Sequence, residues 1–208
     1  HGVREITFYD EAFTLDRDRA ARLCEILISK NIRVSWSANS RVDCVDPELL
    51  ALMKKAGCWR ILYGMESGVE KNLRALAKKT TIHMAEKAAR MTKKAGIETL
   101  ATFVFGCPGE SYEEGLATIR FALSLDLDYA LFLCLSPLPG STLFKMAERQ
   151  GKSIDFSAMT GFSASFDPGG MTRQEQEKLV ETAFKKFYFR IPYVARRFAS
   201  LKSPGDLV

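Results

Sequence analysis

The chain has 208 residues, of which 47% are hydrophobic and 26% charged, and its formal net charge is +5. This length and composition predict one globular domain with a substantial core. No apolar run approaches the ~20 residues needed to cross a bilayer, and the basic residues are spread over separate segments. We therefore expect a cytoplasmic protein that has neither a membrane-spanning segment nor a dedicated nucleic-acid surface.

The five cysteines argue against both a disulfide scaffold and a metal centre. They are Cys24, Cys44, Cys58, Cys107 and Cys134, and they form no CxxC pair or close cluster. Their odd number and wide spacing predict that the cysteines other than Cys107 are reduced and pack as small hydrophobic side chains. With only two histidines in the chain, a zinc site has little support, and we expect no metal ligands.

Five short apolar segments are predicted to form strands. They lie at residues 5–9, 32–38, 59–63, 97–105 and 128–135. They recur about every 30 residues with helical segments between them, which predicts right-handed βαβ units. The fold class is therefore α/β, either part of a parallel (β/α) barrel or a doubly wound open sheet. A complete eight-stranded barrel takes ~250 residues, so a barrel would be incomplete.

Helix-capping residues mark where the helices begin. They are Asp16, Asp46, Ser67, Ser111 and Thr172, each with a side chain that can accept hydrogen bonds from the first helical turn. The last three are followed three residues later by glutamate, the spacing of a capping box. Residues 1–150 hold the strand and helix units, and residues 151–208 are expected to form a loop and a C-terminal helical extension of the same domain.

Carboxylates follow two of the predicted strands, at the ends where parallel α/β folds bind their ligands. Asp10 and Glu11 end the first strand. Two adjacent carboxylates can accept hydrogen bonds from an amine or coordinate a cation, or they can cap the following helix. Glu66 lies between Gly64 and Gly68, where it can accept two hydrogen bonds from a ribose diol or act as a charge at a helix N-terminus.

The second strand leads into a set of polar side chains suited to a carboxylate ligand. Ser37, Asn39 and Arg41 offer a hydroxyl, an amide and a guanidinium. The guanidinium can grip a carboxylate through two hydrogen bonds. The alternative is that Asp43 neutralises Arg41.

The fourth strand leads into a tight turn at residues 106–110. Glycine gives this turn a permissive backbone and proline gives it rigidity. Its exposed backbone groups can pair with a flat heterocycle. The alternative is that these residues form only a tight turn, with Glu110 as an acid at the start of the next helix.

Taken together, these turns resemble those of the radical S-adenosylmethionine (SAM) enzymes, most closely the branch with a cobalamin-binding domain, which includes the anaerobic magnesium-protoporphyrin monomethyl ester cyclases. The matching segments, in chain order, are residues 8–14, 40–43, 56–58, 64–68, 105–111 and 137–141. The resemblance implies a partial (β/α)₆ barrel, of which this chain holds about five of the six units. SAM would lie across the strand ends beside a [4Fe-4S] cluster.

The resemblance also implies an activity and a set of contacts to the methionine part of SAM. In that family, reductive cleavage of SAM at the cluster gives a 5′-deoxyadenosyl radical, which takes a hydrogen atom from a small-molecule substrate. Asp10 and Glu11 would contact the methionine amino group. Arg41 would pair with the methionine carboxylate, with Ser37 or Asn39 nearby.

The nucleoside part of SAM is assigned by the same resemblance. Glu66 would contact the ribose hydroxyls. The backbone at Phe105 and Gly106, and at Leu135 and Ser136, would frame the adenine. The branch also implies that the whole protein can carry cobalamin in an upstream domain.

One feature of the family is missing, namely the CxxxCxxC loop that holds the cluster after the first strand. Three thiolates must converge on one cluster, whereas the cysteines here are scattered, and Cys107 cannot substitute. The sequence also begins with His1 and enters a strand almost at once. We therefore expect the downstream part of a longer enzyme, inactive without the missing N-terminal part of the same chain.

Two other functions stay open. A metal-dependent or Schiff-base (β/α) barrel lyase would use Asp10, Glu11 and Glu66, although the lysines sit in helical stretches and none stands alone at a strand end. A non-catalytic assembly module would self-associate through the sheet edge left by the missing first unit. Residues 191–208 would add a packed helix or a partner surface. Methyl transfer, ring closure and carbon-skeleton rearrangement all stay open as reaction outcomes.

Overall fold

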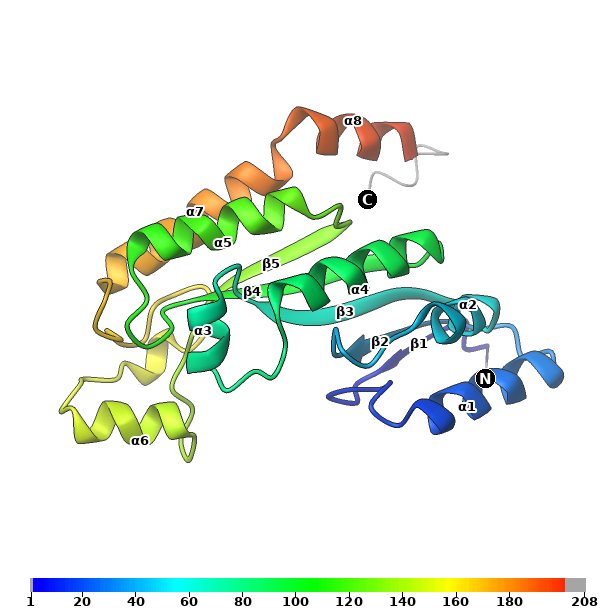
Figure 1. Cartoon of the computed structure of the whole chain (residues 1–208), viewed down its shortest axis with the longest axis horizontal. Helices are drawn as coiled ribbons and strands as arrows, with labels where there is room; N and C mark the ends of the chain where they lie inside the picture. Colours follow the sequence, from blue (N-terminus) through cyan, green and yellow to red (C-terminus); the bar gives the residue numbers. More distant parts are fainter. Residues whose placement is uncertain (1, 201–208) are drawn as a thin grey trace.

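The computed structural model describes residues 2–200, which form an open, five-stranded parallel sheet covered by helices (Figure 1). The strands are β1 (Glu5–Phe8), β2 (Ser35–Ser40), β3 (Cys58–Glu66), β4 (Glu98–Phe105) and β5 (Tyr129–Cys134). They lie in chain order, with every neighbouring pair parallel. The predicted α/β class and partial-barrel order are confirmed.

Eight helices and a short 3₁₀ turn connect and follow these strands in the part of the chain that the structure describes. They are α1 (Arg17–Ser29), α2 (Pro47–Lys55), α3 (Glu70–Ala75), α4 (Ile82–Lys94), α5 (Tyr112–Ser124), α6 (Thr142–Arg149), η1 (Phe156–Ala158), α7 (Arg173–Tyr188) and α8 (Ile191–Ser200). Among residues 2–200, no helix is long and apolar enough to cross a membrane.

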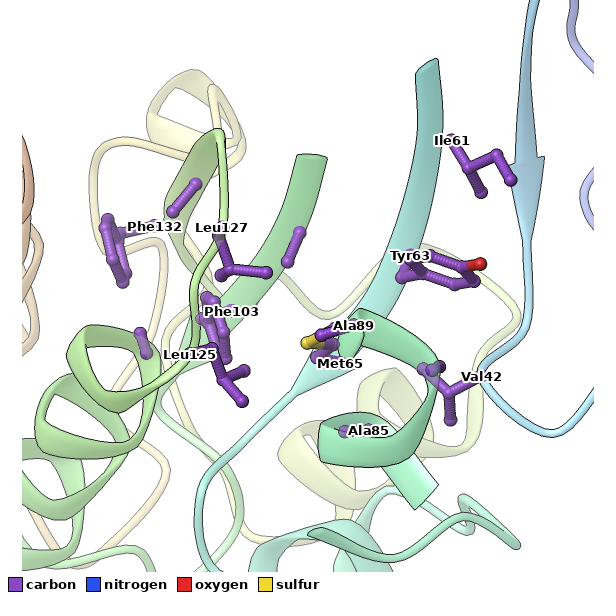
Figure 2. Close-up of a cluster of buried hydrophobic side chains, with 14 of the residues drawn as sticks. Val42, Ile61, Tyr63, Met65, Ala85, Ala89, Phe103, Leu125, Leu127 and Phe132 are labelled. Carbon is purple, nitrogen blue, oxygen red and sulfur yellow. The ribbon is translucent and has the colours of Figure 1, made fainter. Parts of the chain in front are cut away.

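The core lies between one face of the sheet and the helices. Side chains alternate between the two faces of a strand, so that Ala101 and Phe103 of β4 are buried while Thr102 between them is only half-buried. Helices α2, α4, α5 and α7 contact the strands. Figure 2 shows Tyr63 and Met65 of β3 in this core beside α4. The opposite face of the sheet stays more open, as the interior face of an incomplete barrel does.

Most of the predicted helix caps are confirmed, and one is wrong. Ser111 and Thr172 each form a complete capping box. Ser67 does not begin a helix, because α3 starts after Val69, which makes no side-chain cap. The Ser67 hydroxyl instead accepts from the Val69 N–H at 3.2 Å. The Glu70 carboxylate accepts from the Ile82 N–H at 2.9 Å, and so caps α4 rather than α3.

The second strand begins three residues later than the sequence predicts. After α1, Asn31 adopts a φ of 51°, and the Ile32 N–H donates to the Leu27 carbonyl at 2.9 Å. These residues therefore complete the C-terminal turn of the helix, and the ladder starts at Ser35. The predicted strand start at Ile32 is therefore wrong, and the Ile32 side chain is exposed.

The C-terminal segment packs against the last strand. The loop before α7 reaches the free edge of β5, where the Cys134 N–H donates to the Gly161 carbonyl at 2.6 Å. Helix α8 is held by the Tyr193 hydroxyl, which donates to the Asp128 carbonyl at 3.0 Å, and by Arg196, which donates to the Leu127 carbonyl at 2.9 Å. The predicted packed helix is present, and residues 201–208 lie outside the described residues.

Candidate ligand site at the strand ends

A cavity of about 250 Å³ lies at the carboxyl ends of the strands. Four of the predicted site residues line it, namely Glu11, Asn39, Arg41 and Glu66. Lys78, Thr80 and Thr102 complete much of the wall. Side chains from β2, β3, β4 and the loop before α4 thus meet at one place, although the strands that carry them are separated by helices in the sequence.

A larger hollow of about 690 Å³ lies at the opposite ends of the first three strands. Its wall includes Arg4, Ser35 and Gly57, which stand at or just before the amino ends of β1, β2 and β3. Parallel α/β folds bind their ligands at the carboxyl ends. The predicted site residues are also at the carboxyl ends, so the smaller cavity is the candidate site.

Glu66 has an unusual backbone and a close neighbour. Its φ of 62° lies in the left-handed region, which costs a residue other than glycine about 1–2 kcal/mol. The β3–β4 ladder shifts register between Gly64 and Glu66. The carboxylate accepts from Lys78 Nζ at 2.8 Å, and the Glu66 side chain is 16% exposed. Strain of this kind in a ligand-facing turn is typical of functional sites.

The structure separates the two carboxylates that follow β1. Asp10 pairs with Arg19 at 2.8 Å, whereas Glu11 lines the cavity. Neither caps the following helix, because the Asp16 side chain accepts from the Arg19 N–H at 2.9 Å and is the N-cap of α1. Glu11 is therefore the one of the two that faces the candidate site.

Of Ser37, Asn39 and Arg41, which lie in or just after β2, only Asn39 and Arg41 line the cavity. Ser37 and Asn39 share the open face of the sheet, but Ser37 stands two residues further from the carboxyl end of β2, where its hydroxyl is 3.2 Å from that of Thr7. Arg41 donates two hydrogen bonds to Asp43, at 3.0 and 2.9 Å. This pairing lowers the pKa of Asp43. The alternative that Asp43 neutralises Arg41 is the arrangement observed.

The turns after β4 and β5 lie side by side. The family resemblance assigns the backbone of both turns to the adenine of SAM. The Leu135 N–H donates to the Phe105 carbonyl at 2.8 Å. Gly106 has a φ of 94°, and a Cβ at this position would lie 2.3 Å from Gln176 Oε1. Ser136 Oγ is buried and has no hydrogen-bond partner among the described residues. An unpaired hydroxyl at this turn suits a ligand that supplies the missing hydrogen bond.

The sequence interpretation missed the structural role of Glu110 at the turn after β4. It is fully buried, and it accepts from the N–H groups of Gly106 and Cys107 at 2.8 and 3.0 Å. Its other oxygen accepts from Asn72 Nδ2 at 2.8 Å. Burial raises the pKa of Glu110 to about 7. The carboxylate thus fixes the backbone of the turn after β4, and its position directly before the N-cap Ser111 hid this role.

A buried hydrogen-bond network joins the turn after β4 to the turn after β3. Asn72 Nδ2 also donates to the Ser67 hydroxyl at 3.2 Å, which lies 3.0 Å from the hydroxyl of Thr118. Ser67, Asn72 and Thr118 are all buried. Helix α3 therefore connects the two turns, and a displacement of either turn would disturb the other.

The cysteines show no arrangement suited to a cluster. All five are free, and all but Cys44 are buried. Burial raises the pKa of the Cys24 thiol to about 11, and it also raises the pKa of Cys107. Within residues 2–200, no group of three or more cysteine, histidine, aspartate or glutamate side chains could hold a metal ion. These residues do not fit an iron–sulfur cluster.

Comparison with known proteins identifies the family. The model of the radical SAM superfamily matches residues 1–122. The chain belongs to the radical SAM superfamily. Members of this superfamily are enzymes that use SAM and a [4Fe-4S] cluster, and the expectation drawn from the strand-end turns is confirmed at this level.

Two curated relatives of this radical SAM chain extend beyond it. An uncharacterised methyltransferase of Pyrococcus horikoshii is 32% identical over 192 residues, which is 91% of this chain and 42% of that protein. The anaerobic magnesium-protoporphyrin IX monomethyl ester cyclase of Cereibacter sphaeroides is 30% identical over 194 residues, 91% of this chain and 32% of that protein. The chain thus spans less than half the length of either relative.

The fold of this radical SAM chain is also found in solved structures. The radical SAM methyltransferase TsrM of Kitasatospora setae, in a structure with cobalamin and a [4Fe-4S] cluster bound, superposes with a TM-score of 0.65. The match covers 85% of this chain and 37% of that one at 20% identity. This likeness shows a shared (β/α) barrel architecture.

Proposed function

We propose that these 208 residues form the SAM-binding part of a radical SAM enzyme whose whole protein is a methyltransferase or a cyclase acting on a small molecule. The observation that carries this proposal is the convergence of Glu11, Asn39, Arg41 and Glu66 on one strand-end cavity. Family membership and the kinds of relative that match the chain support it.

The charges of the cavity suit the methionine part of SAM, which carries an ammonium and a carboxylate. Glu11 supplies a carboxylate for the ammonium. Arg41 uses Nε and Nη2 for Asp43, which leaves Nη1 for the ligand carboxylate, with the Asn39 amide beside it. Asp10 contributes indirectly, because its pairing with Arg19 ties the end of β1 to α1. Ser37 does not line the cavity, and it supports β2 through its contact with Thr7.

The nucleoside part of SAM would be bound at the carboxyl ends of β3, β4 and β5, the next strands along the sheet. Glu66 has two oxygens that can accept from the two ribose hydroxyls. The backbone of Gly106, held by Glu110, and the region of Ser136 would frame the adenine edge. Phe105 takes part only through its backbone, since its side chain is buried in the core and stacks on Phe132 at 6.3 Å.

We further propose that the cluster ligands lie outside these residues and that the isolated chain is catalytically silent. When bound, the cluster supplies the electron that cleaves SAM. The whole protein is proposed to supply the CxxxCxxC loop and an upstream domain that binds cobalamin; the TsrM structure contains bound cobalamin. Anaerobic reconstitution with iron and sulfide tests this point. We expect no stable [4Fe-4S] spectrum, and a stable cluster spectrum from the 208-residue chain would contradict the proposal.

The exposed edge of the sheet has a related role in this proposal. β1 is an edge strand that pairs only with β2 in the described part of the chain. We propose that it pairs in the whole protein with the strand that carries the cluster loop, and that the isolated chain can self-associate there. Sedimentation at increasing concentration tests the second point, since a clean monomer at high concentration would count against it.

The metal-dependent lyase gains no support from the geometry. Asp10 is paired with Arg19 and Glu66 with Lys78, so the carboxylates that such an enzyme needs are not gathered for a metal. The expectation that the lysines sit in helical stretches, which argued against the Schiff-base version, is wrong for Lys78. Lys78 reaches the end of β3 from the loop before α4, but its ammonium is held by a carboxylate.

Calorimetric titration of the purified chain with S-adenosylhomocysteine tests the main proposal. This ligand keeps the amino acid, ribose and adenine of SAM but cannot be cleaved to a radical. We expect one binding site per chain, with adenosine as a weaker competitor because it lacks the methionine contacts. A folded chain that takes up no S-adenosylhomocysteine at millimolar concentration would contradict the proposal.

A further inference from the structure

An ion pair lies directly against the backbone of β3 inside the candidate site. A Cβ built on Gly64 would lie 2.6 Å from Glu66 Oε1 and 3.6 Å from Lys78 Nζ. The Glu66 carboxylate therefore folds back over its own strand rather than reaching out to solvent. Only glycine at position 64 leaves room for this conformation.

The main chain at Lys78 is fixed by the C-terminal turn of α3. The Lys78 N–H donates to the Leu73 carbonyl at 2.9 Å, and Ala77 has a φ of 54°. This is a Schellman-type helix end. Helix α3 is in turn anchored through the buried Asn72 to Glu110. Lys78 is thus presented to the site from a backbone position that the fold determines.

The ion pair uses only half of the Glu66 carboxylate. Lys78 Nζ contacts Oε1 at 2.8 Å, and Oε2 has no hydrogen-bond partner in the part of the chain that the structure describes. The same cavity contains Glu11 and Arg41. Without Lys78, the Glu66 carboxylate would share the cavity with Glu11 and have no cation of its own, because Arg41 is paired with Asp43. An outward rotation of the carboxylate into water would then be favoured.

We propose that Lys78 is a positioning residue of the nucleoside site, which holds Glu66 folded over Gly64 so that its second oxygen accepts from the ribose of an adenosyl ligand. This inference rests on the proposed function. It adds to the proposed site a residue, Lys78, that lies outside the motifs found in the sequence. Lys78 acts through Glu66, and so its effect is on the recognition of the ribose hydroxyls rather than of the adenine.

The test is a comparison of ribose recognition in matched variants of the 208-residue chain. Adenosine and 2′,3′-dideoxyadenosine are titrated into the wild type, Lys78→Met, Lys78→Arg and the control Lys79→Met, whose lysine is exposed beside the site. We expect the wild type to prefer adenosine by about tenfold. Lys78→Met should lose most of this preference, while Lys78→Arg and Lys79→Met keep it.

A double-mutant cycle separates positioning from a merely structural role. If Lys78 acts through Glu66, the combined variant Lys78→Met/Glu66→Gln should lose no more ribose preference than either single variant. Dideoxyadenosine should bind all folded variants about equally, and thermal unfolding of each variant confirms that it is folded. Lys78→Gln is the second choice if the methionine variant fails to fold.

The failures of the two proposals are distinguishable. A wild type that binds S-adenosylhomocysteine while Lys78→Met keeps the full preference for ribose overturns the role of Lys78 and leaves the proposed function in place. Additive losses in the double variant also overturn that role. A wild type that binds neither S-adenosylhomocysteine nor adenosine removes the proposed function and the role of Lys78 together.

Discussion

Glu66 ends β3 and Glu110 stands in the turn that follows the neighbouring strand β4, yet the two carboxylates are held in opposite ways. Glu66 pairs with Lys78 at the wall of a cavity and keeps one oxygen unused. Glu110 is fully buried and accepts three N–H groups, with no cation paired to it among the described residues. Glu66 thus keeps an oxygen that a ligand in the cavity can reach, whereas the Glu110 carboxylate is used to hold the backbone of its own turn.

The turn after β4 should respond most strongly to a substitution at Gly106. A Cβ there would strike the buried Gln176, whose amide already donates to the Phe166 carbonyl at 3.1 Å, and the backbone φ is positive. We expect Gly106→Ala to lower the free energy of unfolding by about 3 kcal/mol, measured by urea denaturation.

Gly109 offers the matched control. Its φ is also positive, at 69°, but a Cβ would meet nothing within 4 Å. Gly109→Ala should therefore cost only about 1 kcal/mol, the backbone strain alone. Equal losses for the two variants would show that the contact with Gln176 does not constrain the turn.

Glu110 should give the protein an unusual pH dependence. A carboxyl whose pKa is higher in the folded than in the unfolded chain binds its proton more tightly when folded, so its ionisation removes stability as the pH rises. For Glu110 the interval runs from the ordinary value of 4.5 to about 7. Glu110→Gln should gain about 2–3 kcal/mol relative to the wild type across this interval.

Denaturation curves at several pH values between 4 and 8 measure this difference. The glutamine can keep one acceptor for the turn, and the Asn72 amide can rotate to offer its oxygen, which has no partner among the described residues. A difference between variant and wild type that stays constant with pH would mean that Glu110 is not buried in the folded protein as described.

A substitution at Glu66, which ends β3, should affect ligand binding rather than the stability of the fold. Glu66→Gln removes the charge that accepts from the ribose hydroxyls, and we expect it to weaken S-adenosylhomocysteine binding by about tenfold or more. The free energy of unfolding should change by less than about 1 kcal/mol, because the lost ion pair is partly exposed. The exposed Glu113→Gln is the control, and calorimetry is the measurement.

The smallest expected effect concerns β2, which lies beyond Glu66 along the sheet. Asp43→Asn removes the carboxylate that pairs with Arg41. Because this carboxylate competes with the ligand carboxylate for the guanidinium, its removal should strengthen S-adenosylhomocysteine binding two- to threefold. Adenosine, which has no carboxylate, should bind unchanged. Weaker binding of both ligands would show instead that Asp43 positions Arg41 for the site.

Much of the fold could be predicted from the sequence because its signals are local. The capping boxes at Ser111 and Thr172 close within four residues, and both form. The box at Ser67 fails because distant partners compete for the same groups. The Ser67 hydroxyl meets Thr118, and Glu70 reaches Ile82.

Only those residues of the candidate site that lie near predicted strand ends could be predicted from the sequence. Glu11, Asn39, Arg41 and Glu66 lie at or just after the carboxyl ends of strands and reach one cavity, because parallel strands bring their carboxyl ends together. Lys78 and the contact of Glu110 with Asn72 depend on how α3 packs. Their partners stand 12 and 38 residues away in the chain, which no local pattern reveals.

The most direct test of the central claim is to locate the binding site by nuclear magnetic resonance. S-adenosylhomocysteine is titrated into the 15N-labelled chain, and the amide shifts are followed. We expect the largest changes in amide chemical shift at Gly64, Glu66, Gly106 and Ser136, at the carboxyl ends of the strands. Changes confined to the amino ends, around Asn31 and Gly57 in the larger hollow, would contradict it, as would the absence of any shift.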